Sequence, residues 1–131
     1  MSATSKLLVI ATIALGLPLA AQAEDYADGA IKTMETSKGE VLTDGKGMTL
    51  YTFDKDAENT SNCYDDCAVK WPPLMAGASA TAEAPFTLVT RKDGSRQWAH
   101  NGKPLYLWQA DKAPGDVTGD GVGGVWHVVK D

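Results

Sequence analysis

The sequence is poor in the residues that build many active sites and nucleic-acid surfaces. It has two histidines and two cysteines among 131 residues, and its 12 Lys and Arg are outnumbered by 17 Asp and Glu. The basic residues are scattered and form no run. Binding to nucleic acid or to anionic lipid depends on clustered Lys and Arg. The composition therefore argues against both kinds of partner.

Motifs typical of enzymes and of metal sites are missing as well. Nothing resembles a nucleophile elbow, and neither histidine lies in a catalytic motif. The metal-binding spacings HxH, MxxM and DxDxDG do not occur, and the two cysteines do not form a CxxC pair. We therefore expect that the protein is not an enzyme.

The one long apolar run lies at the start of the chain. Leu7 to Leu19 follows Lys6 and precedes Ala21-Gln22-Ala23, a small-x-small cleavage site. This pattern predicts a secretory signal peptide over residues 1–23. The run is too short for a comfortable membrane span, and Glu24 stands where a lipid-attachment cysteine would follow the cleavage site. We expect a periplasmic or secreted protein that is soluble after cleavage.

The remaining residues, 24–131, number 131 − 23 = 108, the size of one ordinary domain. All 17 acidic residues and 11 of the 12 basic ones fall in this part, which gives a net charge of 11 − 17 = −6. Its cysteines, Cys63 and Cys67, lie in the segment CYDDC. An exported chain with an even number of cysteines usually oxidises them, so we expect a local disulfide. A metal-binding or redox dithiol is the alternative.

Strand and turn signals alternate along the chain, so we expect a mostly β fold with one short helix. The helix is expected over residues 64–70, with Asn62 as its N-cap, and Trp71-Pro72-Pro73 ends it. Asn101-Gly102 is a strong signal for a hairpin turn of type I′. Residues 75–84 are small and resemble a flexible linker. The expected strands are 31–35, one beginning at Val41, 48–53, 86–90, 96–100, 104–108 and 125–129.

A shift of 55 positions superposes the two halves of this pattern without a gap. It aligns residues 31–71 with residues 86–126 and produces identities at turns, strand aromatics and loop acids. We take this as an internal duplication. Two copies in one domain predict three- to four-stranded repeats related by a pseudo-twofold axis, since a solenoid needs more copies. The identical pairs are Gly39/Gly94, Gly47/Gly102, Leu50/Leu105, Tyr51/Tyr106, Asp56/Asp111, Asp65/Asp120 and Trp71/Trp126.

The segments YTFDKD at 51–56 and YLWQAD at 106–111 both fit Y-x-[FWY]-x-x-D. With CYDDCAVKWPPL and PGDVTGDGVGGVWHV, they make the chain resemble a bacterial secreted-repeat family of predicted lipoproteins that carry this motif in paired copies. The resemblance covers nearly all of residues 24–131. It implies little about function, because the family is one of unknown function. This sequence lacks the lipid-attachment cysteine of the lipoprotein members, so a lipid anchor is not expected.

Six motif residues are the candidate site. Alternate strand residues share one face, so the tyrosine and the second aromatic of each motif are expected to pack together in the core. The aspartate follows the strand and can accept loop N–H groups. The alternative is functional, with the two tyrosines and two aspartates lining a shared groove that binds a polar ligand or a cation. The residues are Tyr51, Phe53, Asp56, Tyr106, Trp108 and Asp111.

No cofactor is expected, but two metals remain as alternatives. Asp111, Asp116 and Asp120 lie among glycines, and their carboxylates suit a hard cation such as calcium. Copper would need His or Met ligands, for which the chain offers His100, His127, Met48 and Met75. The sequence therefore predicts a small binding or envelope-accessory module whose partner is an unknown envelope protein or small ligand. A metal-binding or redox accessory protein is the second hypothesis.

Overall fold

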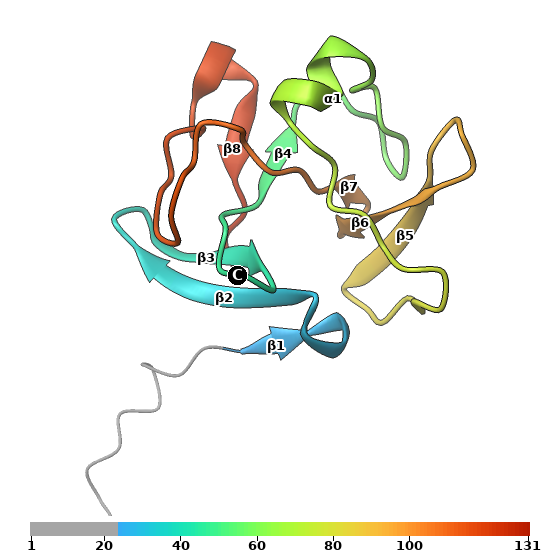
Figure 1. Cartoon of the computed structure of the whole chain (residues 1–131), viewed down its shortest axis with the longest axis horizontal. Coiled ribbons are helices and arrows are strands. Elements are labelled where there is room, and N and C mark those ends of the chain that lie inside the picture. The colour runs from blue at the N-terminus through green and yellow to red at the C-terminus, as the bar shows by residue number, and fades with distance from the viewer. Residues whose placement is uncertain (1–23) are drawn as a thin grey trace, which may run out of the picture.

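Three small antiparallel sheets and one short α-helix make up the fold in the computed structural model, which describes residues 24–131 (Figure 1). The expected signal peptide, residues 1–23, lies outside the described residues. The mostly β class with one short helix is confirmed. The elements are β1 (Asp25–Tyr26), η2 (Ala27–Gly29), β2 (Ile31–Thr36), β3 (Gly39–Asp44), β4 (Tyr51–Phe53), α1 (Asp66–Lys70), β5 (Phe86–Thr90), β6 (Arg96–His100), β7 (Lys103–Pro104), η3 (Val122–Gly124) and β8 (Trp126–Val128).

Two of the sheets are built on hairpins that lie 55 positions apart in the sequence. The hairpin of β2 and β3 belongs to the sheet β1-β2-β3, and that of β5 and β6 belongs to β5-β6-β7. In Figure 1 they lie on opposite sides of the molecule. The predicted turn at Asn101-Gly102 joins β6 to β7, and both residues have positive φ (52° and 81°), as a type I′ turn requires.

The third sheet joins the two repeats. β4 of the first repeat pairs with β8 of the second, with Thr52 opposite His127. The equivalent contact also occurs in the other direction: the N–H of Leu107, in the second repeat, donates to the carbonyl of Pro72, at the end of the first repeat, at 2.7 Å. The segment that ends each repeat therefore lies against the other repeat. Each repeat therefore needs the other repeat to complete the backbone hydrogen bonds of its final segment.

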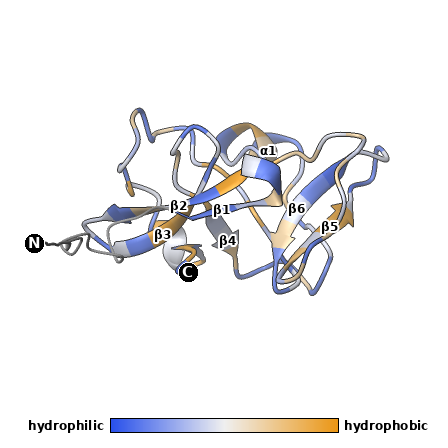
Figure 2. Cartoon of the chain, turned by 90° about the horizontal axis from the view of Figure 1, so that it is seen from below, coloured by the Kyte–Doolittle hydropathy of each residue, from blue (hydrophilic) through white to orange (hydrophobic). Residues whose placement is uncertain are grey.

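A shared core fills the space between the hairpins. Its buried residues include three pairs of equivalent positions, and Figure 2 shows hydrophobic and hydrophilic residues mixed along the strands. Some polar strand residues are buried as well, among them Thr33, Thr43 and Gln97. The equivalent pairs are Ile31 with Phe86, Leu50 with Leu105, and Leu74 with Val129.

Three expectations need correction. The strand expected at 48–53 is reduced to β4, and the one at 104–108 to β7, because Tyr51 and Tyr106 leave their hairpins to pair with each other. The helix begins at Asp66, and Asn62 is not its N-cap. The Asn62 side chain instead donates to the Lys55 carbonyl at 2.8 Å.

The segment 75–84 lies against the second repeat. The Ala76 N–H donates to the Arg96 carbonyl at 2.8 Å. The Arg96 guanidinium in turn donates to the carbonyls of Gly77 and Ala78. No helix in residues 24–131 has the length and apolar character needed to cross a membrane.

Candidate functional site

The two motif tyrosines are bonded to each other through their backbones. The Tyr51 N–H donates to the Tyr106 carbonyl at 2.8 Å, and the Tyr106 N–H donates to the Tyr51 carbonyl at 2.9 Å. These residues occupy the same position in the two repeats, since 51 + 55 = 106. An antiparallel pair of equivalent residues is what a twofold axis between them requires. The pseudo-twofold axis therefore passes between Tyr51 and Tyr106.

The tyrosine and aspartate of each motif bond across this axis. The Tyr51 hydroxyl donates to Asp111 Oδ2 at 2.7 Å. The Tyr106 hydroxyl donates to Asp56 Oδ2, also at 2.7 Å. Each tyrosine therefore bonds to the aspartate of the other repeat, and the two motifs are linked by a reciprocal pair of buried or half-buried hydrogen bonds.

Each aspartate also fixes the loop that follows it, as the sequence suggested. Asp56 Oδ1 accepts the Asn62 N–H at 2.7 Å. Asp111 Oδ1 accepts the N–H of Thr118 at 3.0 Å and its hydroxyl at 2.6 Å. One carboxylate oxygen thus serves the loop and the other serves the opposite tyrosine.

Four aromatic rings form a stacked column beside the tyrosines. Trp71 and Trp126, another equivalent pair, stack with ring centroids 3.8 Å apart and planes 1° apart. Trp108 stacks on Trp71 at 4.0 Å, and Phe53 stacks on Trp126 at 4.1 Å. The second aromatic of each motif therefore caps one end of the column, and the same pseudo-twofold axis relates the two ends.

Each tyrosine meets the column edge to face. The Tyr51 ring lies 5.3 Å from the Trp71 ring at 79°, and the Tyr106 ring lies 5.2 Å from the Trp126 ring at 90°. Burial raises the pKa of both phenols well above their ordinary value, and the bonds to Asp111 and Asp56 raise it further. Both hydroxyls remain protonated donors at any physiological pH, so the tyrosines cannot serve as bases.

For the two tyrosines and Asp111, burial favours the interpretation as core packing over that of a shared ligand groove. Tyr51 and Tyr106 are fully buried, and Asp111 is 7% exposed. Phe53 and Asp56, in contrast, line a pocket of about 330 Å³ together with Glu58 and other residues of 52–58 and 101–103. Burial raises the pKa of Asp56, while bonds from Asn62 and Tyr106 act in the opposite direction.

The predicted disulfide between Cys63 and Cys67 is present, with Cα atoms 5.2 Å apart. The two cysteines are therefore not a reduced dithiol. Cys63 is fully buried against the aromatic column. Its carbonyl accepts a bond from Arg91 Nη2 at 2.8 Å.

The three aspartates considered for calcium have separate partners. Asp116 Oδ2 accepts the N–H groups of Lys112 and Ala113, and Asp111 is engaged as described above. Asp120 accepts the Val128 N–H and pairs with Lys38, and these contacts lower its pKa. Within residues 24–131 no group of three or more His, Cys, Asp or Glu is arranged to hold a metal.

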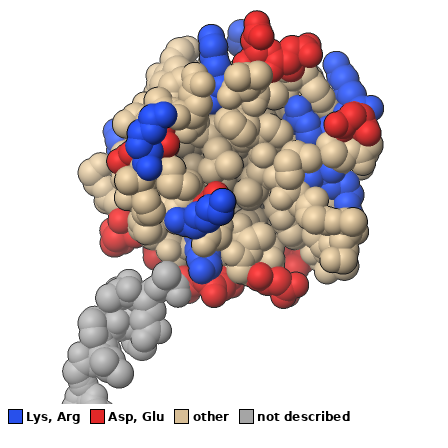
Figure 3. All heavy atoms as spheres, viewed as in Figure 1, with Lys and Arg blue, Asp and Glu red and all other residues tan. Residues whose placement is uncertain are grey.

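The two histidines considered for copper have different neighbours. His127 Nε2 lies 2.8 Å from Asp54 Oδ2, whereas the ring of His100 packs near Phe86. On the face seen in Figure 3, Lys and Arg side chains are interspersed with Asp and Glu.

Sequence reasoning missed several residues that complete the motif. Arg91 is 7% exposed and donates from Nη1 to Ser61 Oγ at 3.0 Å and to Gln97 Oε1 at 2.7 Å. Ser61 Oγ lies 2.6 Å from the Tyr106 hydroxyl. Ser61 lies 30 positions from Arg91 and 45 positions from Tyr106, so no local pattern could reveal its contacts.

Gly119 is a further residue that the sequence did not single out. Its N–H donates to the Tyr51 hydroxyl at 3.1 Å. A Cβ atom there would lie 2.9 Å from ring atoms of both Trp71 and Tyr51. Only glycine lets the backbone come this close to the rings.

The division into two repeats agrees with the comparison with known protein families. Neither the curated proteins nor the solved structures contain a significant match. The family model Lipoprotein_15, described as a secreted repeat of unknown function, matches twice, at residues 32–75 and 87–130. These matches coincide with the two repeats, and together they cover more than half of the chain. The chain therefore belongs to this family of secreted repeats.

Proposed function

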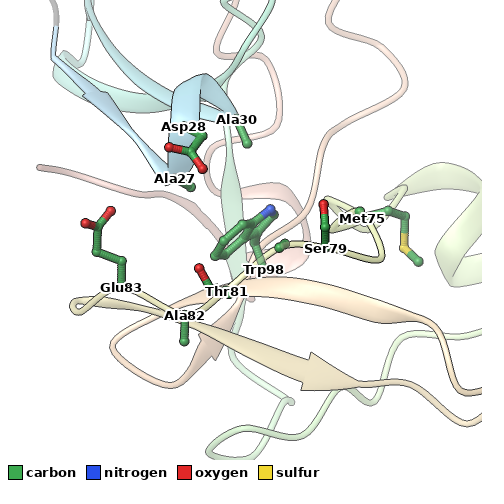
Figure 4. A pocket seen from close by; sticks show the side chains of 11 residues that line it. Ala27, Asp28, Ala30, Met75, Ser79, Thr81, Ala82, Glu83 and Trp98 are labelled. Carbon is green, nitrogen blue, oxygen red and sulfur yellow. The ribbon is translucent and has the colours of Figure 1, made fainter.

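We propose that the protein is a small-ligand binding module of the periplasm or cell exterior. The observation that carries the proposal is a pocket of about 400 Å³ with the indole of Trp98 among its lining side chains (Figure 4). Its walls come from the turn at 27–30 and from the segment 75–83. A volume of this size suits a small molecule. The secreted character of the family supports the cellular location.

The motif residues act as the frame of this module. Their hydroxyl and carboxylate groups are used to join the repeats, so few are free to meet a ligand. This frame holds β2 and β5 in place. The first wall of the pocket immediately precedes β2 in the sequence, and the second wall precedes β5. Walls that are attached to hydrogen-bonded strands reduce the ordering cost of binding.

The pocket lining combines small side chains with one large aromatic. Alanines and Gly77 leave space, while Ser79 and Thr81 supply hydroxyl groups. At the rim, Met75 is 46% exposed, which is unusual for so large an apolar side chain in this protein. The accessible lining is more polar than apolar, which suits a small polar molecule.

Trp98 supplies the most specific feature. Its side chain is 3% exposed. The small exposed part of its indole borders the pocket, where it offers a ligand an aromatic contact.

The pocket beside Phe53 is less suitable. Two of its three carboxylates already have partners, because Asp54 bonds to His127 and Asp56 bonds to Tyr106 and Asn62. We therefore place the ligand beside Trp98. The described residues of that pocket include neither a histidine nor a cysteine, which favours binding over catalysis.

The experiment is a thermal-shift screen of the exported protein against small amines, carboxylates, sugars and nucleosides. A ligand that binds only the folded state raises the melting temperature. Hits should disappear in Thr81→Trp, because the side chain of Thr81 points toward Trp98 and a bulky ring there would fill the pocket (Figure 4). They should persist in Ala57→Trp, which places the same ring at an exposed position of the other pocket. The proposal fails if no compound shifts the melting temperature, or if Thr81→Trp retains every hit.

A further inference from the structure

We propose that the aromatic column passes single electrons from the two buried tyrosines, Tyr51 and Tyr106, to a one-electron oxidant that reacts at the surface with Trp108. The geometry behind this activity is a stack of three indoles that contacts both tyrosines and has one partly exposed end. The stack belongs to a different hydrophobic cluster from Trp98, so the activity is independent of the ligand pocket.

The rings of the stack are close enough for an electron to pass directly between them. The centroids of Trp108 and Trp71 are 4.0 Å apart, and those of Trp71 and Trp126 are 3.8 Å apart with nearly parallel planes. Rings at this separation are in van der Waals contact. Tryptophan and tyrosine are also the aromatic side chains that lose an electron most readily. The three indoles therefore form a continuous path.

Only one end of the column suits the entry of an oxidant. Trp71 and Trp126 are 4% and 5% exposed, whereas Trp108 is partly exposed. The other end is capped by Phe53, which is also partly exposed. Its benzene ring is much harder to oxidise than an indole. An oxidant in solution therefore takes its electron at Trp108.

The tyrosines have the proton acceptors that their oxidation requires. A phenol that loses an electron becomes a strong acid and must release its proton. The Tyr51 hydroxyl donates to Asp111 Oδ2 at 2.7 Å, and the Tyr106 hydroxyl donates to Asp56 Oδ2 at 2.7 Å. Each carboxylate can therefore accept the phenolic proton along an existing hydrogen bond.

Two branches meet at Trp71. The Tyr51 ring lies 5.3 Å from the Trp71 ring, which gives the branch Tyr51–Trp71–Trp108. The Tyr106 ring lies 5.2 Å from the Trp126 ring, and Trp126 stacks on Trp71. Every electron that reaches Trp108 from a motif tyrosine therefore passes through the Trp71 indole.

The electrons and protons of the shorter branch balance. The oxidant, a small inorganic or oxygen-derived radical, takes one electron from Trp108 and is reduced. Trp71 replaces the electron of Trp108, and Tyr51 replaces that of Trp71. The O–H bond of Tyr51 breaks as its proton passes to Asp111 Oδ2. The products are the reduced oxidant, a neutral Tyr51 radical and a protonated Asp111, so the protein has lost one electron and no proton.

The test is pulse radiolysis of the exported protein in azide solution. The azidyl radicals formed by the pulse oxidise tryptophan and become azide ions. Time-resolved absorption then follows the decay of the tryptophan radical and the growth of the tyrosyl radical. We expect both processes to share one first-order rate constant that does not change with protein concentration, because the electron moves within one molecule.

Variants with phenylalanine locate the path while each keeps a ring in the core. Trp71→Phe removes the junction of both branches, so the tyrosyl growth should be lost and the radical should stay on Trp108. Tyr51→Phe combined with Tyr106→Phe should also abolish the growth.

The matched control is Tyr26→Phe. The Tyr26 hydroxyl is likewise bonded to a carboxylate, that of Glu24, but its ring lies beside Phe86 and outside the column. This variant should show the tyrosyl growth of the unaltered protein. Melting curves of all variants would verify that they are folded.

A further double variant tests the proton acceptors. Asp56→Asn combined with Asp111→Asn retains groups that can accept a hydrogen bond but cannot take the proton. The tyrosyl growth should become slower by about a hundredfold, the lower end of what a positioned proton acceptor contributes. An unchanged rate in the folded double variant would show that the two carboxylates are structural only and would overturn the proton transfer.

Three other results would overturn the path itself. Tyrosyl growth that persists in Trp71→Phe would show that electrons bypass the column. A rate that rises with protein concentration would show transfer between molecules, and decay of the tryptophan radical without a tyrosyl signal would show that the tyrosines are not oxidised. None of these results would affect the ligand pocket beside Trp98.

Discussion

Tyr51 donates its hydroxyl to Asp111, a residue of the other repeat, at 2.7 Å. The aspartate five positions after Tyr51 in its own motif, Asp56, is bonded instead by Tyr106. The motif Y-x-[FWY]-x-x-D is therefore complete only when two copies meet. This accounts for its occurrence in pairs, because a single copy would leave a buried phenol without its acceptor.

The first prediction concerns this crossed pair. Tyr51→Phe and Asp111→Asn, made singly and together, should show a coupling energy of about 1–3 kcal/mol in urea unfolding. Tyr51→Phe combined with Asp56→Asn, the pair within one motif, should give a clearly smaller coupling. A larger coupling energy for the pair within one motif than for the pair across the repeats would contradict the crossed hydrogen bonding.

The second prediction concerns the stacked tryptophans. Trp71→Ala and Trp126→Ala should each lower the free energy of unfolding by about 3–5 kcal/mol, because each removes a buried ring from the column. Because the two rings are in contact, the double variant should depart from additivity. Val69→Ala, on a side chain that is 69% exposed, should change the free energy by less than about 0.5 kcal/mol. Losses near that control value for either tryptophan would refute the column as a core element.

The third prediction uses two glycines. Gly119→Ala should destabilise the protein by about 1–3 kcal/mol, since its methyl group would collide with the rings of Trp71 and Tyr51. Gly77→Ala is the matched control, because a Cβ atom there meets nothing within 4 Å. Chemical unfolding of both variants checks the difference, and equal stability would show that the rings can move aside.

The fourth prediction concerns pH. Burial lowers the pKa of His100, and Lys103 lowers it further while Asp131 acts in the opposite direction. Between this lowered value and the unfolded value of about 6.5, the unfolded chain binds more protons than the folded chain. The stability that depends on neutral His100 is therefore present above pH of about 6.5 and is lost as the pH falls through that window. His100→Gln should flatten this part of the profile of unfolding free energy against pH, whereas an unchanged slope would count against the burial effect.

Much of the local structure could be predicted from residue patterns. Phe86–Thr90 and Arg96–His100 are strands with the expected bounds, because β-rich runs bounded by turn residues specify a hairpin locally. The turn at Asn101-Gly102 formed for the same reason. The Cys63–Cys67 disulfide was also predictable, since four positions of separation allow the Cα atoms to approach.

The ligand pocket could not be predicted, although a trace of it is visible. Extending the 55-residue shift toward the N-terminus aligns Asp28 with Glu83, which marks equivalent acidic positions ahead of both repeats. That alignment does not reveal that Trp98 lies between their segments. The position of Trp98 follows from the packing of β6 against the N-terminal turn, a contact between distant parts of the chain.

The sequence by itself determined the unit of this protein: a hairpin, a motif, an acidic loop and a tryptophan, used twice. Local turn chemistry and strand periodicity specify that unit, and the constant spacing of 55 identifies the second copy. Only the tertiary structure decided which tyrosine meets which aspartate. The two copies carry the same residues at the same positions, so pairing within a repeat and pairing across repeats look identical in the sequence. Pairing across the repeats occurs because the final segment of each repeat lies against the other repeat. This arrangement brings Asp111 to Tyr51 and Asp56 to Tyr106.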